Sequence, residues 1–298
     1  AASVVGTAVR GGWRHFDSAC DYGNEREVGE GLKGAISAGD CTREQLFVTS
    51  KLWNTFHARE HVRPACERTL ADLGLEYLDL YLMHFPISQP FVDFEERYPP
   101  EWVSPETGKM ELADVPIRET WEAMEGLVDA GLVRNIGVCN FTVQGLGDLL
   151  RYARVRPAVL QVEMHPYLGQ DKLLAYASEN GVHVTAFSPL GAGSYVELGM
   201  DRGLGKGALG EDAVRGVAER HGKTPAQVLL RWGIQRGTSV IPKTTKAERL
   251  SENLDVEGFE LSAEDMAAIS ALDRDLRFND PGEFCKGMGM PNGYPIYN

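Results

Sequence analysis

Several features that mark common protein classes are missing from this sequence of 298 residues. No apolar run approaches the roughly 20 residues that a membrane-spanning helix needs, and no signal peptide is visible. The five cysteines are scattered and include no Cys-x-x-Cys pair, which is typical of free thiols in a reducing compartment. No group of cysteines and histidines has the spacing of a zinc site. We therefore expect a cytoplasmic protein without a membrane anchor or a bound metal.

Basic residues are also fewer than acidic ones. The chain has 30 lysines and arginines against 43 aspartates and glutamates, a formal net charge of −13 at pH 7. This balance argues against nucleic acid as a general partner, because a phosphate backbone attracts basic surfaces. An anionic small molecule needs only a local basic cluster and is not excluded. The Gly-x-Gly-x-x-Gly fingerprint of the doubly wound dinucleotide-binding folds does not follow any predicted strand.

Strand-like and helix-like segments alternate almost throughout the chain, a pattern typical of βα units on a parallel sheet. The pattern predicts about eight helices and seven strands, the strands at residues 14–17, 46–51, 77–83, 133–138, 158–163, 182–187 and 238–241. A closed (β/α)8 barrel requires eight strands. We therefore expect an α/β fold, a TIM barrel whose first strand, with any N-terminal hairpin, precedes residue 1.

No linker and no change in composition divides the chain, so we expect one domain over residues 1–298. Long loops inside a compact domain are usually functional or disordered. We expect three such segments at the active-site face, at residues 85–115, 191–210 and 273–298. After the first predicted strand, Asn24 is placed to cap the following helix, with Glu27 completing a capping box.

Ionisable residues end three apolar runs in the first third of the chain. Asp17, Lys51 and His84 each end such a run, and Tyr22 lies shortly after the first. If the runs are neighbouring parallel strands, these side chains gather at one mouth of the barrel, where enzymes of this architecture keep their chemistry.

This set of side chains is suited to moving a proton. A lysine cation lowers the pKa of a nearby tyrosine, an aspartate holds the lysine in place, and a histidine can hydrogen-bond a substrate oxygen. The set predicts protonation of an alkoxide that forms from a carbonyl. The alternative is a buried ion pair with a tyrosine and a histidine nearby by chance.

Segment 241–253 predicts an anion site. Lys243 and Thr244 lie between a strand and a helix N-terminus, whose free N–H groups and dipole favour phosphate. Arg249 adds positive charge in an otherwise acidic protein. Lys246 is also basic, but for this residue we favour a solvated helix face.

The chain resembles the aldo-keto reductase family from residue 1 to the tail. The strings that carry the resemblance are His15-Phe-Asp-Ser-Ala19, Tyr22-Gly-Asn-Glu25, Thr49-Ser-Lys-Leu-Trp53, Leu82-Met-His-Phe-Pro86, Gly137-Val-Cys-Asn-Phe141, Gln161-Val-Glu-Met-His-Pro-Tyr167, Phe187-Ser-Pro-Leu-Gly191 and the 241–253 motif. Within the family the chain most resembles the xylose reductases, through Glu96-Arg-Tyr-Pro-Pro100, Ser194-Tyr-Val-Glu197 and Leu276-Arg-Phe-Asn-Asp-Pro281.

The resemblance implies NADPH-dependent reduction of a carbonyl. Tyr22 would donate the proton, tuned by Lys51 and Asp17, and His84 would orient the substrate oxygen. Other residues match positions that bind the coenzyme in the family: Asn140, Gln161 and Cys139 at the nicotinamide carboxamide, Phe187 under its ring, Ser188 and Leu190 at the pyrophosphate, Lys243, Thr244 and Arg249 at the 2′-phosphate, and Glu252 and Asn253 at the adenine.

Phe187 departs from the family pattern, and two further positions, Cys139 and Glu197, leave alternatives open. Phe187 stands where the family usually has tyrosine and keeps the stacking face. Cys139 stands where serine is common, and is either a weak carboxamide contact or a buried small residue. Glu197 lies where some xylose reductases bind adenosine hydroxyls, which would permit NADH as well; the alternative is a solvated loop carboxylate.

The resemblance also implies a small carbonyl substrate. Trp53 and Phe85 would wall the pocket, with Trp102 as a further wall or a loop anchor. Asp21 and Asn279 would bond sugar hydroxyls, and such polar groups sharpen selection. We therefore expect reduction of an aldose such as D-xylose.

Two other functions stay open at this stage. One is a broad aldehyde or ketone reductase whose natural substrate is not a sugar. The other is a non-catalytic barrel that only binds a cofactor, against which the complete set of proton-handling residues argues. In each case we expect a monomer or a homodimer.

Overall fold

The computed structural model covers residues 1–298 and describes all of them except 192, 194, 197–198, 201, 205–206 and 298. The described residues form two compact units. Unit 1 consists of Ala1–Leu160 with Asp280–Asn298, and unit 2 of Gln161–Asn279. All seven strands that the sequence predicts are present, and each overlaps its predicted range.

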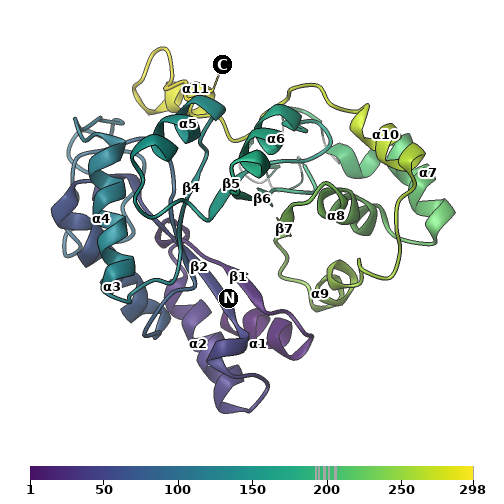
Figure 1. Ribbon diagram of the computed structural model, residues 1–298, viewed down its shortest axis with the longest axis horizontal. Helices are drawn as coiled ribbons and strands as arrows, with labels where there is room; N and C mark the ends of the chain where they lie inside the picture. Colours follow the sequence, from purple (N-terminus) through teal and green to yellow (C-terminus); the bar gives the residue numbers. More distant parts are fainter. Residues whose placement is uncertain (192, 194, 197–198, 201, 205–206, 298) are drawn as a thin grey trace. The chain divides into compact units, whose positions relative to one another are not determined.

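Unit 1 is built on four parallel strands that pair in chain order: β1 (His15–Asp17), β2 (Phe47–Leu52), β3 (Leu80–Met83) and β4 (Ile136–Cys139). In the pairing register Asp17 lies opposite Thr49, and Lys51 lies opposite Leu82. Strand β5 (Val159–Glu163) begins in this unit (Figure 1). Because the strands are parallel, their carboxyl ends meet at one edge of the sheet.

The described residues of unit 1 also form six helices, of which α2 to α5 connect successive strands. They are α1 (Ala2–Arg10), α2 (Glu25–Ser37), α3 (Arg59–Leu73), α4 (Ile117–Asp129), α5 (Val143–Tyr152) and the short α11 (Pro281–Phe284). Single 3₁₀ turns occur at η1 (Cys20–Tyr22), η2 (Arg43–Gln45), η3 (Asn54–Phe56) and η6 (Cys285–Met288). On α3 the buried side chains include Val62, Cys66 and Leu70, and Gly74 ends the helix in the left-handed conformation with φ 63°.

Helices α2 and α3 pack closely against each other (Figure 1). Gly29 of α2 allows this approach, because a Cβ at this position would overlap the backbone of Leu73. The distance between the two helices is therefore set by a glycine.

Unit 2 contains the parallel pair β6 (His183–Phe187) and β7 (Ser239–Ile241), with Phe187 opposite Ile241. Its helices are α6 (Asp171–Glu179), α7 (Asp212–His221), α8 (Pro225–Gln235), α9 (Ala247–Leu254) and α10 (Ala263–Ser270), and η5 spans Gly207–Gly210. A core of buried side chains that includes Val217, Trp232 and Ile269 joins α7, α8 and α10.

One local prediction is wrong. Asn24 is the N-cap residue of α2, but its side chain makes no capping hydrogen bond, so the capping box with Glu27 does not form. Asn24 has φ −136° and ψ 19°, outside the extended conformation that aims a capping side chain at the first turn. Helix α11 was not predicted because four residues are too few to show a helical period.

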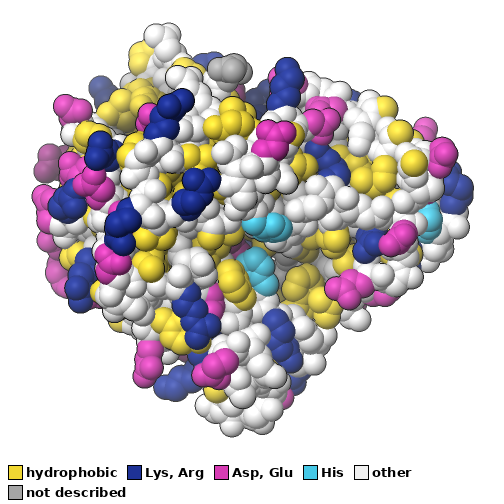
Figure 2. All heavy atoms as spheres, in the orientation of Figure 1, with side chains coloured by type: hydrophobic (Ala, Val, Ile, Leu, Met, Phe, Trp, Pro, Cys, Tyr) yellow, Lys and Arg dark blue, Asp and Glu magenta, His cyan; other side chains and the backbone are white. Residues whose placement is uncertain are grey.

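The surface carries mixed charge. Basic and acidic side chains are interspersed on the face drawn in Figure 2. Among the described residues, every helix is too short or too polar to cross a membrane.

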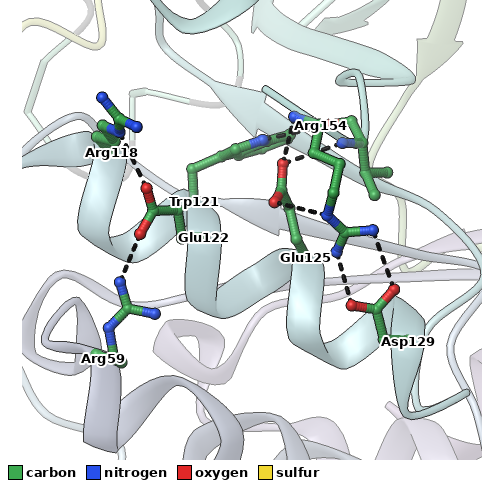
Figure 3. Close-up of polar contacts among 8 residues, drawn as sticks. Arg59, Arg118, Trp121, Glu122, Glu125, Asp129 and Arg154 are labelled. Atoms are coloured by element: carbon green, nitrogen blue, oxygen red, sulfur yellow. Dashed lines mark hydrogen bonds and ion pairs between the residues drawn. The ribbon is translucent and has the colours of Figure 1, made fainter. Parts of the chain in front are cut away.

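The buried carboxylate of Glu125 joins α4 to the segment between α5 and β5 (Figure 3). Glu125 of α4 is 5% exposed, and its Oε1 accepts hydrogen bonds from the backbone N–H groups of Arg154 at 2.7 Å and Val155 at 3.0 Å. The indole N–H of Trp121 donates to the Val155 carbonyl at 3.2 Å. On the same helix, Glu122 pairs with the exposed arginines Arg59 and Arg118.

We predict that Glu125→Ala lowers the free energy of unfolding by about 3 kcal/mol, because it leaves two backbone N–H groups without their charged acceptor. Glu122→Ala removes an equal charge from the same helix and should cost less than about 1 kcal/mol, since its ion pairs are exposed. Urea unfolding of both variants is the measurement. Equal losses in the two variants would contradict the prediction.

Candidate active site

The structure brings Asp17, Tyr22, Lys51 and His84 together at the carboxyl edge of the unit 1 strands. Asp17 is the last residue of β1, Lys51 lies near the end of β2, and His84 directly follows β3. Tyr22 ends the 3₁₀ turn η1 that follows β1. The parallel pairing of the strands therefore places on one edge the groups that the sequence separates by up to 67 positions (84 − 17).

Lys51 is the centre of this group. Its side chain is fully buried, and its Nζ contacts three oxygens: it pairs with Asp17 Oδ1, donates to Ser18 O at 2.8 Å, and donates to the Tyr22 hydroxyl at 3.3 Å. Burial alone would lower the pKa of Lys51, but its interactions with Asp17, Tyr22 and Cys139 together outweigh burial and raise this pKa well above its usual value. Lys51 is therefore a cation at neutral pH.

Tyr22 has an exposed ring and a desolvated hydroxyl. The residue is 50% exposed, yet its hydroxyl lies against Lys51 among buried groups. Desolvation raises the pKa of Tyr22 to about 12, while Lys51 acts in the opposite direction. Lys51 thus lowers the pKa of Tyr22, as the sequence predicts, but burial raises the same pKa by more. At neutral pH Tyr22 is a neutral phenol, the form that a proton donor must have.

His84 is held neutral beside this donor. It is 7% exposed, and burial, followed by the nearby Lys51 charge, lowers its pKa well below the usual value. Its ring lies 6.1 Å from the Tyr22 ring and 5.3 Å from the Trp53 ring, between centroids. Among the described residues, no partner is found for the buried Nδ1 of His84 or Nε1 of Trp53. Buried polar atoms are normally paired, so both suit a polar ligand.

Aromatic side chains form a wall next to His84. The predicted wall residues Trp53 and Phe85 are buried, and both lie edge-on to Trp102, at 5.0 and 4.9 Å between centroids. Phe284 of the tail extends the wall, with its ring 5.0 Å from Trp102. Phe284 could not be predicted as a wall residue, because the tail has no helical or strand period.

The two predicted sugar-binding residues lie in different units. Asp21 is in η1 next to Tyr22, and burial raises the pKa of its carboxyl to about 6, although Lys51 opposes this change. Asn279 lies in unit 2, where its backbone N–H donates to Glu163 Oε2 at 2.8 Å.

Cys139 and Asn140, predicted at the nicotinamide, end and follow β4. Cys139 is 1% exposed, and burial raises the pKa of its thiol. Asn140 adopts a left-handed conformation with φ 62°. Its Nδ2 donates to the His84 carbonyl at 2.9 Å, and its Oδ1 accepts from the hydroxyl of Tyr297 at 2.9 Å. These two bonds fix the orientation of the Asn140 carboxamide.

Unit 2 holds the other predicted coenzyme residues. Gln161 is buried in β5, and Phe187 ends β6. Ser188 follows with φ 51°, and its Oγ donates to the Tyr195 hydroxyl at 3.1 Å. Leu190 packs against the unit 2 core. Glu197 lies outside the described residues.

The predicted anion site lies at the N-terminus of α9. Lys243 and Arg249 are exposed, and Thr244 accepts a hydrogen bond from Lys246 N at 3.1 Å. Lys246 is the N-cap residue, and its side chain caps no N–H of the helix. Two cations, a hydroxyl and uncapped helix N–H groups fit a phosphate group.

The two predicted adenine contacts are on the same helix. Glu252 Oε1 accepts from Thr224 Oγ1 at 2.6 Å, and Asn253 is 5% exposed. No cluster of three or more histidine, cysteine, aspartate or glutamate side chains in the described part of the chain could hold a metal ion.

A model of the aldo/keto reductase family matches residues 1–274. The chain belongs to this family. Two similar proteins are described as probable NAD(P)H-dependent D-xylose reductases. The one from Aspergillus fumigatus is 54% identical over 281 residues, 94% of this chain and 89% of the relative. The one from Arthroderma otae is 53% identical over 291 residues, 97% of this chain and 88% of the relative.

Solved structures of this family are similar over nearly the whole chain. The aldose reductase of Schistosoma japonicum is 39% identical with a TM-score of 0.84, covering 99% of this chain and 89% of that one. The aldo-keto reductase of Bombyx mori, solved in complex with NADP, is 34% identical with a TM-score of 0.82, covering 98% and 88%. These matches confirm the family that the sequence strings indicated.

We predict that Lys51→Met destabilises this aldo-keto reductase by about 3 kcal/mol or more, because it leaves the Asp17 carboxylate buried without its partner. The double variant Asp17→Asn/Lys51→Met should lose less than the sum of the two single variants, since it removes both buried charges. Urea unfolding of the four proteins gives the coupling free energy. Additive losses would contradict a tightly coupled pair.

Proposed function

We propose that this aldo-keto reductase catalyses the NAD(P)H-dependent reduction of an aldose such as D-xylose to the alcohol. The observation that carries the proposal is the buried Lys51 cation, which contacts both Asp17 and the Tyr22 hydroxyl. This arrangement, with a neutral His84 beside it, is suited to delivering a proton to a carbonyl oxygen. The similarity to proteins described as D-xylose reductases supports the same activity.

In the proposed mechanism, the reduced nicotinamide supplies a hydride to the carbonyl carbon when it is bound. Tyr22 hydrogen-bonds the carbonyl oxygen and donates its proton as negative charge develops there. Lys51 stabilises the phenolate that this transfer leaves, and Asp17 keeps Lys51 charged and in place. His84, neutral and buried, orients the substrate oxygen.

We assign a separate group of residues to each part of the coenzyme. We assign the 2′-phosphate to Lys243, Thr244 and Arg249 at the uncapped N-terminus of α9. The other proposed contacts are Asn140, Gln161 and Cys139 for the carboxamide, Phe187 for the ring, Ser188 and Leu190 for the pyrophosphate, and Glu252 and Asn253 for the adenine. NADPH is the proposed coenzyme, with NADH as a second one.

The proposal extends to the substrate and the fold. Asp21 and Asn279 are the proposed contacts of sugar hydroxyls, and Trp53 and Phe85 the apolar wall. A reductase of simple aldehydes would need the wall but not the two polar residues, which is why we favour an aldose.

The similarity to aldose reductase structures supports the (β/α)8 barrel. Five free cysteines support a cytoplasmic location.

We predict that Tyr22→Phe lowers kcat for carbonyl reduction by about 10²-fold or more, because it removes the proton donor. Oxidation of NADPH and NADH is followed with D-xylose, other aldoses and simple aldehydes. Binding of NADPH should change little, which separates loss of the donor from loss of the fold. No turnover of any carbonyl by the wild type would refute the function. Turnover confined to simple aldehydes would favour the broad reductase.

We further predict that Arg249→Ala raises the KM for NADPH by about tenfold to a hundredfold, the range expected for losing a hydrogen bond between two charged groups. The KM for NADH should stay within about twofold, because NADH lacks the 2′-phosphate. Lys246→Ala removes an equal charge from the same helix end and serves as the control. If the two variants affect NADPH equally, the positive field of the helix end, and not a specific contact, accounts for the effect.

A further inference from the structure

A buried carboxylate lies behind the candidate site and takes no part in the chemistry proposed above. Glu25 is the first residue of α2 and is 4% exposed. It accepts hydrogen bonds from Ser50 Oγ at 2.6 Å, Thr69 Oγ1 at 3.1 Å and the Tyr98 hydroxyl at 3.4 Å. Burial raises the pKa of Glu25 to about 7, although the bonds from Ser50 and Thr69 oppose this change. An apolar side chain would fill the space at lower cost, so the hydrogen bonds need an explanation.

The explanation lies in the segment that carries Tyr22. This segment, residues 18–25, connects β1 to α2 and is attached to β2 at both ends. At its start, Ser18 N donates to Thr49 O at 2.8 Å, and the Ser18 carbonyl accepts from the β2 lysine. At its end, the Glu25 carboxylate accepts from Ser50. Three consecutive residues of β2 therefore hold the segment.

The attachment at Ser50 is close to Tyr22 in the chain. Only Gly23 and Asn24 separate Tyr22 from Glu25, and Gly23 N is itself bonded to Cys20 O at 3.0 Å. Neighbouring residues of a strand point to opposite faces, so Ser50 binds Glu25 on one face of β2 while the next residue, the lysine, meets Tyr22 on the other. The two contacts therefore hold the same short segment from opposite faces of the strand.

We propose that Glu25 is a positioning residue, whose hydrogen bond with Ser50 holds the Tyr22 hydroxyl at its distance from Lys51 Nζ. The distance in question is 3.3 Å, long enough for a small displacement to break the contact. This inference rests on the proposed role of Tyr22 as proton donor.

The test compares two donors to the same carboxylate. Ser50→Ala removes the donor on β2. Thr69→Val removes the donor on α3, a residue for which the described contacts include neither Tyr22 nor Lys51. For each variant kcat, the KM for NADPH and the solvent deuterium isotope effect on kcat are measured with D-xylose, or with the best aldehyde substrate, and urea unfolding gives the loss of stability.

We expect Ser50→Ala to lower kcat roughly tenfold or more and to increase the isotope effect, because a displacement of about 1 Å can cost as much as a hundredfold in rate. The KM for NADPH should stay within about twofold, and Thr69→Val should keep kcat within about twofold, on the same argument that it displaces neither reacting group. Glu25→Gln retains an oxygen for Ser50 and should keep most of the activity that Glu25→Ala loses.

Two results would overturn the proposal. One is an unchanged kcat in Ser50→Ala, and the other is an equal fall of kcat in Ser50→Ala and Thr69→Val, which would reflect general destabilisation. Tyr22→Phe separates this failure from failure of the function itself. If Tyr22→Phe is inactive while Ser50→Ala keeps its activity, the role of Tyr22 as proton donor is supported and the positioning role of Glu25 is refuted.

Discussion

The pairing of Lys51 with Asp17 is the interaction on which the rest of the candidate site depends. A buried ammonium group is strongly disfavoured without a counter-ion, and Lys51 is fully buried. The neighbouring strand β1 supplies the carboxylate, and parallel pairing in register brings the two side chains to one edge. Once Lys51 is held as a cation, its charge acts on every polar group around it.

The same small region thus holds one cationic and two neutral titratable groups. Lys51 is a cation, Tyr22 is a neutral phenol, and His84 is a neutral imidazole, each displaced from its ordinary pKa by burial and by neighbouring charge. Together with the Asp17 carboxylate they carry no net charge. A site of this kind can take an uncharged carbonyl compound without a large electrostatic penalty and can still stabilise the charge that develops during reduction.

Much of the fold and part of the site could be predicted from the sequence, because both depend on local patterns. Alternating apolar runs predicted all seven strands, and the ionisable residues that end them predicted the cluster of Asp17, Lys51 and His84. Properties that depend on packing could not be predicted. Sequence spacing suggested Asn24 and Glu27 as a cap, whereas the buried carboxylate of Glu25 carries the contacts across elements. The exposed ring and desolvated hydroxyl of Tyr22 are likewise a matter of three-dimensional surroundings.

The close packing of α2 on α3 has a consequence for how this protein can change over evolutionary time. Glu25 and Gly29 are one helical turn apart on α2, and the residues they face, Thr69 and Leu73, are one turn apart on α3. Adding a single methyl group at Gly29 would push α2 outward and take Glu25 with it. If Glu25 positions Tyr22 as proposed, substitution of Gly29 is therefore restrained by the accuracy that catalysis demands as well as by the space between the two helices.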